Sequence, residues 1–273
     1  MNKIALPQKI EFAKGDKPNQ GTVVIEPCYP GYGTTLGTAL RRALLSSLEG
    51  AAVVGVKIKG ADHEFMALPH IKEDVLELVL NFKQIRLKVH SDEIIKLELS
   101  AHGEKEVTAA DIKANSQVEI VNKDLHIADI TDMAGNLDAE IYVARGRGYE
   151  TLESREDVKK EIGYIAMDSI YSPVLAVGID VDNTRVGKMT NWDKLILNIT
   201  TDGTISVEDA FSKSVEILME QFGSLILTEA KGENIEEPFI NNEIASDDID
   251  EDTGENDAEE SEGKKKRGRP KKS

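Results

Sequence analysis

Two histidines and a glutamate near residue 65 are the first side chains in the sequence that could bind a metal. His63 and Glu64 precede His70, and zinc hydrolases often use histidine ligands with a glutamate base. In the H-E-x-x-H motif the histidines lie one helical turn apart, so both reach one ion. Here they are seven residues apart, and Pro69 interrupts any helix between them. We therefore predict a polar loop, with a metal site as the weaker alternative.

Asp180 and Asp182 are a second pair of candidate ligands. They lie two residues apart in a predicted strand, so both carboxylates would share one face and could bind Mg²⁺. Val181 between them would then point into the core. Because the sequence indicates no further acidic partner, we favour the wet face of an edge strand over a magnesium site.

Two glycine pairs and a lone cysteine are the remaining features that could support chemistry. Gly31-Tyr32-Gly33 precedes a predicted helix, where either an anion could bind or a tight turn could be needed. Gly146-Arg147-Gly148 lacks the spacing of a phosphate loop. Cys28 is the single cysteine, no histidine near it in sequence could activate it, and there is no G-x-S-x-G elbow. We predict no catalytic residue, no metal and no cofactor in this chain.

Two segments with helical periodicity would position a protein-binding surface. In the first, from Thr34 to a stop at Gly50, the apolar stripe is Leu36, Ala39, Leu40, Ala43, Leu44 and Leu48. In the second, from about Val207 to Leu227, Ser206 and Asp209 form a candidate capping box. Its apolar seam is Phe211, Val215, Leu218, Phe222 and Leu225. A core helix is the simpler interpretation of this seam, and a dimer interface is the alternative.

Arg41 and Arg42 lie on the first of these helices. At 100° per residue, Arg42 points almost opposite the centre of the apolar stripe and Arg41 lies on its flank. An exposed arginine usually belongs to a solvated face. The alternative is an anchor for a partner protein, because arginine is enriched at interface hot spots.

Short alternating runs predict strands through the first two-thirds of the chain. Ile95, Leu97 and Leu99 alternate with polar residues, and so do Leu195, Leu197 and Ile199. No apolar run is long enough for a membrane span, and no signal segment opens the chain. Together with the single cysteine, these features predict a soluble cytoplasmic protein.

The net charge of −17 over 273 residues is unevenly placed. Residues 243–262 hold 11 acidic residues in 20 positions, and residues 264–272 hold 7 basic residues in 9 positions. Without these two blocks 39 acidic and 26 basic residues remain, so the body is too acidic to be a nonspecific DNA clamp. Its predicted partners are proteins. Residues 231–273 are predicted to be a disordered acidic tail with a basic end.

Several sequence blocks in register resemble one family, the bacterial RNA polymerase α subunits. The most specific is residues 35–47, TLGTALRRALLSS, with residues 26–27 and 31–34 leading into it. Further blocks lie at residues 63–65, 73–78, 80–81, 107–112, 145–149, 171–174, 185–187, 193–195 and 202–204. Together they span roughly residues 4–228.

The resemblance implies an α+β fold in two parts. A discontinuous two-helix dimerisation module with an antiparallel sheet would comprise residues 1–49 and 173–230, and a mainly β insert domain residues 50–172. The chain would homodimerise and scaffold the β and β′ subunits of DNA-directed RNA polymerase without an active site of its own. The implied dimer interface is Leu36, Leu40, Leu44, Phe211, Val215, Leu218, Phe222 and Leu225. Arg42, and less strongly Arg41, would contact the β subunit.

The chain departs from the family pattern in three places. Pro69-His70-Ile71 stands where Pro-Gly-Val is usual, Trp192 replaces a leucine or tyrosine, and a C-terminal helical domain is not recognised. In its place Arg267 and Arg269, flanked by Lys265 and Lys266, resemble an AT-hook that enters the minor groove of A·T-rich DNA. A solubilising tail is the simpler interpretation. An alternative function is therefore a free-standing dimeric architectural DNA-binding protein acting through this tail.

Overall fold

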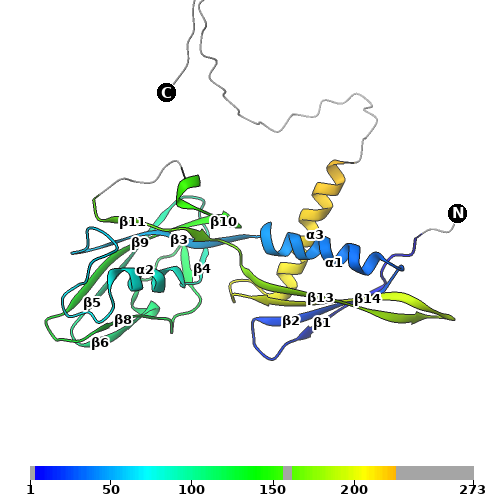
Figure 1. Cartoon of the computed structure of the whole chain (residues 1–273), viewed down its shortest axis with the longest axis horizontal. Coiled ribbons are helices and arrows are strands. Elements are labelled where there is room, and N and C mark those ends of the chain that lie inside the picture. Colours follow the sequence, from blue (N-terminus) through cyan, green and yellow to red (C-terminus); the bar gives the residue numbers. More distant parts are fainter. Residues whose placement is uncertain (1–3, 156–161, 226–273) are drawn as a thin grey trace, which may run out of the picture. The chain divides into compact units, whose positions relative to one another are not determined.

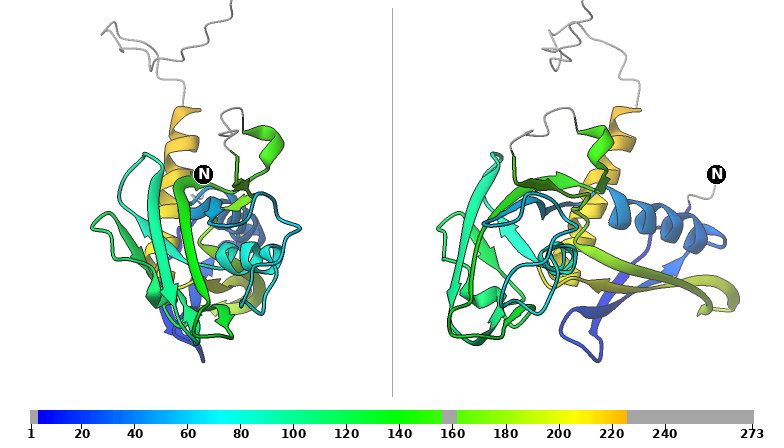
Figure 2. Two further views of the ribbon diagram at one scale, coloured as in Figure 1. Left: turned by 90° about the vertical axis from the view of Figure 1, so that its left-hand side faces the viewer. Right: turned by 60° about the vertical axis from the view of Figure 1, so that its left-hand side comes forward.

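The computed structural model describes residues 4–155 and 162–225 (Figures 1 and 2). Within these ranges the chain is α+β, as predicted, and its paired strands are antiparallel. The helices are α1 (Tyr32–Ser46), α2 (Val75–Lys83) and α3 (Val207–Ser224). None of the helices in the described ranges has the length and apolar character that a bilayer crossing requires.

Two four-stranded sheets form the framework. The first contains, in order, β1 (Lys9–Lys14), β2 (Gln20–Cys28), β14 (Met189–Thr201) and β13 (Val174–Val186). The second contains β11 (Tyr164–Ala166), β3 (Glu49–Ile58), β9 (Asn136–Arg147) and β5 (Ile95–His102). Three strand pairs complete the described part: β4 (Leu87–Val89) with β7 (Val118–Ile120), β6 (Lys105–Thr108) with β8 (His126–Ile130), and β10 (Tyr149–Glu150) with β12 (Ser169–Ile170).

The first sheet joins the beginning of the chain to its later part. Leu197 of β14 pairs with Val23 of β2, and the side chain of Asn19 donates to the carbonyl of Thr201 at 2.7 Å. One face of the sheet is apolar because buried residues alternate along both strands. Helices α1 and α3 cover this face and contact each other (Figure 1). The resulting core contains Val23, Ile25, Leu40, Leu44, Leu195, Leu197, Ile199 and Phe211.

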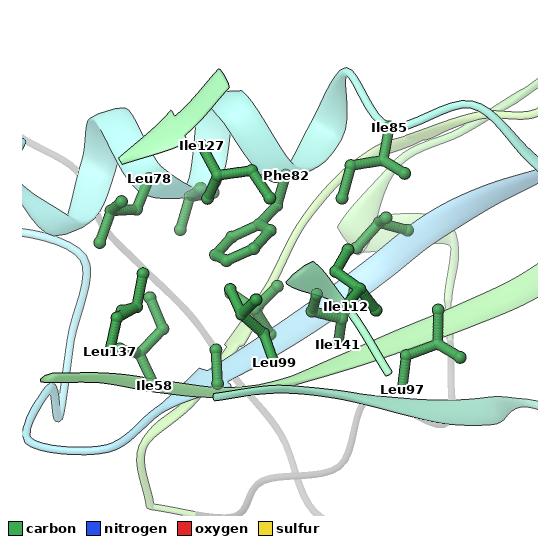
Figure 3. Packing of buried hydrophobic residues seen from close by; sticks show 14 of the residues in the cluster. Ile58, Leu78, Phe82, Ile85, Leu97, Leu99, Ile112, Ile127, Leu137 and Ile141 are labelled. Carbon is green, nitrogen blue, oxygen red and sulfur yellow. The ribbon is translucent and has the colours of Figure 1, made fainter. Parts of the chain in front are cut away.

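A second core lies between α2 and the second sheet (Figure 3). Phe82 of α2 is fully buried and points toward Leu99 of β5 and Ile141 of β9. The alternation of Ile95, Leu97 and Leu99 is confirmed, since each side chain of this set is buried while its neighbours are exposed. Both predicted domain limits, after residue 49 and before residue 173, fall between the two cores.

The first predicted helix is confirmed but its end is wrong. Helix α1 stops at Ser46, and Gly50 lies in β3 instead of ending the helix. A Cβ on Gly50 would stand 1.8 Å from the carbonyl oxygen of Tyr171, so glycine is needed there for the close approach of the Tyr171 backbone, which lies between β12 and β13. The tail prediction for residues 231–273, with Lys265, Lys266, Arg267 and Arg269, lies outside the described residues.

Candidate assembly interface

The N-terminus of α1 is held by an aspartate from a distant strand. Gly31 is the N-cap residue at φ 85°, and glycine has no side chain to cap the helix. One carboxylate oxygen of Asp193 on β14 accepts hydrogen bonds from the backbone N–H groups of Gly31 (2.9 Å) and Gly33 (3.0 Å). The anion expected at this helix end is thus supplied by the chain itself.

Small residues seat α1 directly on the first sheet. A Cβ on Gly37 would lie 2.8 Å from Cδ1 of Leu195, and a Cβ on Gly33 would lie 2.9 Å from Cγ1 of Val181. Leu40 and Leu44 on the same helical face are buried in the core. The sheet therefore fixes one face of α1, and the opposite face is free for other contacts.

Arg41 and Arg42 lie on the outward part of α1. Both side chains are exposed, whereas their neighbours Leu40, Ala43 and Leu44 are buried. The helical-wheel placement of Arg42 is confirmed by this burial pattern. The role of either arginine as a contact for a partner subunit stays a prediction.

Helix α3 is anchored at its N-terminus and exposed toward its C-terminus. The Ser206 hydroxyl accepts from the N–H of Asp209 at 3.0 Å and donates to its carboxylate, which gives the N-cap half of the predicted capping box. Phe211 and Ser214 are buried in the following turns. In the last turns Met219 and Phe222 are 67% and 60% exposed. Figures 1 and 2 show these turns extending beyond α1.

The eight residues predicted at a dimer interface fall into three groups. Leu40, Leu44 and Phe211 are buried in the core of the single chain and are not open to a second copy. Leu36, Val215 and Leu218 are half-buried at the edge of this core. Phe222 and Leu225 are exposed. The apolar surface available to a partner is therefore centred on the C-terminal half of α3.

The arginines of the Arg145–Tyr149 motif bind a glutamate on the neighbouring strand. Arg145 donates to Glu49 at 2.6 Å and to Asp92 at 3.0 Å, and Arg147 also binds Glu49. Hydrogen bonds from Arg147 and Arg145 lower the pKa of the Glu49 carboxyl. Gly148, at φ 66°, makes the turn that follows β9. These contacts account for the motif structurally.

The candidate metal and nucleophile residues are not brought together. The ring nitrogen Nδ1 of His63 accepts from the N–H of Phe65, while His70 lies in a turn at φ 62°. Asp180 and Asp182 lie on β13, an edge strand as predicted, but Val181 between them is 40% exposed instead of buried. Helix α1 contacts β13, and a Cβ on Gly33 would lie 2.9 Å from Cγ1 of Val181, so this side chain packs against the helix while remaining partly exposed.

Cys28 is buried, and its thiol donates to the carbonyl of Ile25 at 3.6 Å. Burial, reinforced by the negative charge of Asp193, raises the pKa of the Cys28 thiol. A neutral buried thiol is a poor nucleophile.

Sequence reasoning missed one cluster of titratable groups. In the described ranges, Glu73, His126 and Asp129 are the residues whose ligand atoms come within 4.8 Å of one another. Both carboxylate oxygens of Glu73 already accept hydrogen bonds, from His126 and from the N–H of Asp129. We assign no metal to this group. Glu73 and His126 are 53 positions apart in the sequence, and no local pattern joins them.

The comparisons with known proteins agree on one family. The family described as "RNA polymerase Rpb3/RpoA insert domain" matches residues 56–172. The DNA-directed RNA polymerase subunit alpha of Symbiobacterium thermophilum is 48% identical over 216 residues, which cover 79% of this chain and 68% of the relative. The chain belongs to the family of bacterial RNA polymerase α subunits.

Other relatives place the chain in the same family. The corresponding subunit of Desulforamulus reducens is 48% identical over 81% of this chain and 70% of its own length. That of Clostridium botulinum strain Eklund 17B is 50% identical over 74% of this chain. The match covers 64% of the Clostridium protein, so the chain spans about two-thirds of the relatives it matches. The family resemblance read from residues 35–47 is confirmed.

Proposed function

We propose that this chain forms a homodimer that scaffolds the β and β′ subunits of RNA polymerase and contributes no catalytic group itself. Family membership supports a place in the polymerase complex. The observation that carries the proposal is the exposed apolar end of α3, next to a helix α1 that is rigidly seated on its sheet.

A second copy of the same chain is the natural cover for the end of α3. Met219, Phe222 and Leu225 are 67%, 60% and 74% exposed, at i, i+3 and i+6 on one side of the helix. In a two-fold symmetric dimer each of these side chains would pack against the same patch of the partner, so every contact would be made twice. Each buried side chain of this kind stabilises an association by about 1–2 kcal/mol. Leu36, Val215 and Leu218 would extend the contact from the half-buried edge.

The dimer is tested by placing a charge in this patch. Phe222→Glu should give monomers by light scattering after gel filtration at micromolar concentration, because a buried unpaired carboxylate is costly. Ile94→Glu is the matched control, since Ile94 is also exposed, at 59%, but lies in the loop before β5. A Phe222→Glu chain as dimeric as the wild type would contradict the proposal.

The outer face of α1 is the proposed contact for the β subunit. Arg42 is exposed opposite the buried stripe, so its guanidinium can reach a partner without disturbing the core. Arg42→Ala should keep the homodimer and weaken capture of co-expressed β subunit about tenfold or more, as seen for interface hot spots. Arg41→Ala serves as the neighbouring control and should weaken capture less. Native mass spectrometry would measure both, and wild-type capture by Arg42→Ala would refute this role.

The alternative of a free-standing architectural DNA-binding protein has less support. Family membership favours the polymerase function, and the basic tail that motivated the alternative lies outside the described residues. Purification of the tagged chain from its own cells separates the two. The polymerase function requires stoichiometric large subunits in the eluate.

A further inference from the structure

His126, the first residue of β8, lies between two carboxylates from different elements. Its Nδ1 is 3.1 Å from Oε1 of Glu106 on β6, and its Nε2 is 3.2 Å from Oε1 of Glu73 in the loop before α2. The Glu106 side chain is 64% exposed, whereas that of Glu73 is only 5% exposed. One imidazole ring therefore connects a surface strand to a buried carboxylate.

Glu73 ties the beginning of α2 to β8. Its second oxygen, Oε2, accepts from the N–H of Asp129 at 2.8 Å, and Asp74 directly after it is the N-cap of α2. Lys72 adds two contacts to Asp129: its N–H donates to the carbonyl at 3.1 Å, and its ammonium lies 2.9 Å from the carboxylate. Helix α2, which places Phe82 in the second core, is thus held against β8 by the contacts of Lys72 and Glu73 with Asp129.

The geometry around His126 suits the protonated ring. A neutral imidazole carries one N–H and can donate to one carboxylate, so its other nitrogen would direct a lone pair at an oxygen. The imidazolium donates to both. Burial opposes the charged ring, but hydrogen bonds to Glu73 and Glu106 outweigh it and raise the pKa of His126.

The charged groups on the elements around the His126 ring favour its protonated, positively charged form. The loop before α2 and α2 itself supply Lys72, Glu73 and Glu77, β6 supplies Glu106, and β8 supplies Asp129. Lys72 is already paired with Asp129. A carboxylate as buried as Glu73 needs a compensating positive charge, and the ring of His126 is the nearest group that can provide it.

We propose that His126 is a proton-dependent clamp: its imidazolium bridges Glu73 and Glu106 and so fastens α2 to the β6–β8 pair. Deprotonation leaves one carboxylate facing a lone pair and loosens the start of α2. Because the folded-state pKa lies above the ordinary value of 6.5, the clamp is complete below that pH. Its contribution is lost as the pH rises through the folded pKa.

The clamp is tested on the full chain, with a chelator present, by titrating its five histidines by NMR and by thermal unfolding from pH 6 to pH 8. His126→Gln assigns the resonance of His126. We expect this resonance to titrate above the ordinary histidine value of 6.5, and the wild-type Tm to fall about 2–4 °C more than that of His126→Gln over this range. Glu106→Gln changes a side chain that is 64% exposed, and it should shift the titration of His126 downward and reduce the pH slope. His102→Gln is the control, because His102 contacts the Ser100 hydroxyl.

Two results would overturn the clamp. The first is a His126 titration at or below the ordinary histidine range that Glu106→Gln leaves unchanged. The second is a stoichiometric Zn²⁺-dependent rise in Tm, in the absence of chelator, that disappears in His126→Gln. That rise would make the cluster a metal site instead of a proton site.

Discussion

The hydrogen bonds from α1 to Asp193 allow the helix anchor to be tested quantitatively. Asp193→Ala removes the acceptor of two backbone N–H groups at 2.9 and 3.0 Å, at a helix end whose own N-cap residue is a glycine. Loss of an N-cap acceptor costs about 1 kcal/mol, and loss of a negative charge at the helix N-terminus costs about 0.3–1 kcal/mol more. We expect the free energy of unfolding to fall by about 2 kcal/mol.

Asp193→Asn separates these two contributions. The amide oxygen can still accept both hydrogen bonds, so this variant should lose only the charge contribution, about 0.5–1 kcal/mol. Asp182→Ala and Asp182→Asn are the matched controls, because Asp182 is an exposed acidic residue on the adjacent strand β13. Both should stay within about 0.5 kcal/mol of the wild type.

Urea unfolding at one fixed protein concentration is the assay, because dimerisation itself adds to the apparent stability. An Asp193→Ala variant that unfolds at the wild-type midpoint would refute the stabilising role of Asp193. Asp182 variants that lose as much stability as the Asp193 variants would also refute it, since the effect would then be one of net charge.

Three further changes probe other contacts. His70 occupies a φ of 62°, so His70→Gly should raise the free energy of unfolding by about 0.5 kcal/mol while His70→Ala lowers it, as measured by urea midpoints. Glu49→Gln should cost about 0.5 kcal/mol at neutral pH, because the arginine partners are partly solvated; as the lowered pKa of Glu49 requires, this difference should vanish as the pH falls through the folded pKa of Glu49. Deleting residues 264–273 should abolish any salt-sensitive binding to an A·T-rich duplex in a mobility-shift assay, and equal affinity of full-length and truncated chains would reject the AT-hook hypothesis.

The sequence predicted those parts of the fold that have one buried and one exposed face. Helix α1, helix α3 and strand β5 each show such a pattern, and each is present. The β1 strand was missed although Ile10 and Phe12 alternate with Lys9 and Glu11, because two apolar positions make a short signal for a strand whose six residues are all exposed.

Helix α2 was missed although its signals are present in the sequence. Asp74 caps the N–H of Glu77 at 2.7 Å, and Val75, Leu78, Val79 and Phe82 follow the helical period. A nine-residue helix contains little more than two turns, so its apolar pattern is too short to be distinguished from the strand patterns on either side of it.

The candidate site was predicted only in part. The helix faces and the outward direction of Arg42 follow from the 100° rotation per residue, a local property. The contact between Asp193 and Gly31 spans 162 residues, and the division of the apolar seam into buried Phe211 and exposed Phe222 depends on where the sheet ends beneath α3. Such contacts follow from tertiary packing, which a single sequence does not encode in any local pattern.

The pairing of β2 with β14 has a consequence for how the chain is made. Val23 leaves the ribosome 174 residues before Leu197, its partner, and at bacterial synthesis rates this delay is roughly 10–30 s. The second core, drawn from the continuous stretch between Val53 and Met167, is synthesised roughly 2–6 s before Leu197. A nascent chain therefore contains the whole second core while the β1–β2 hairpin near its N-terminus still lacks its partner strand β14. During this delay, a chaperone that binds exposed strands of the nascent chain would matter most for residues 9–28.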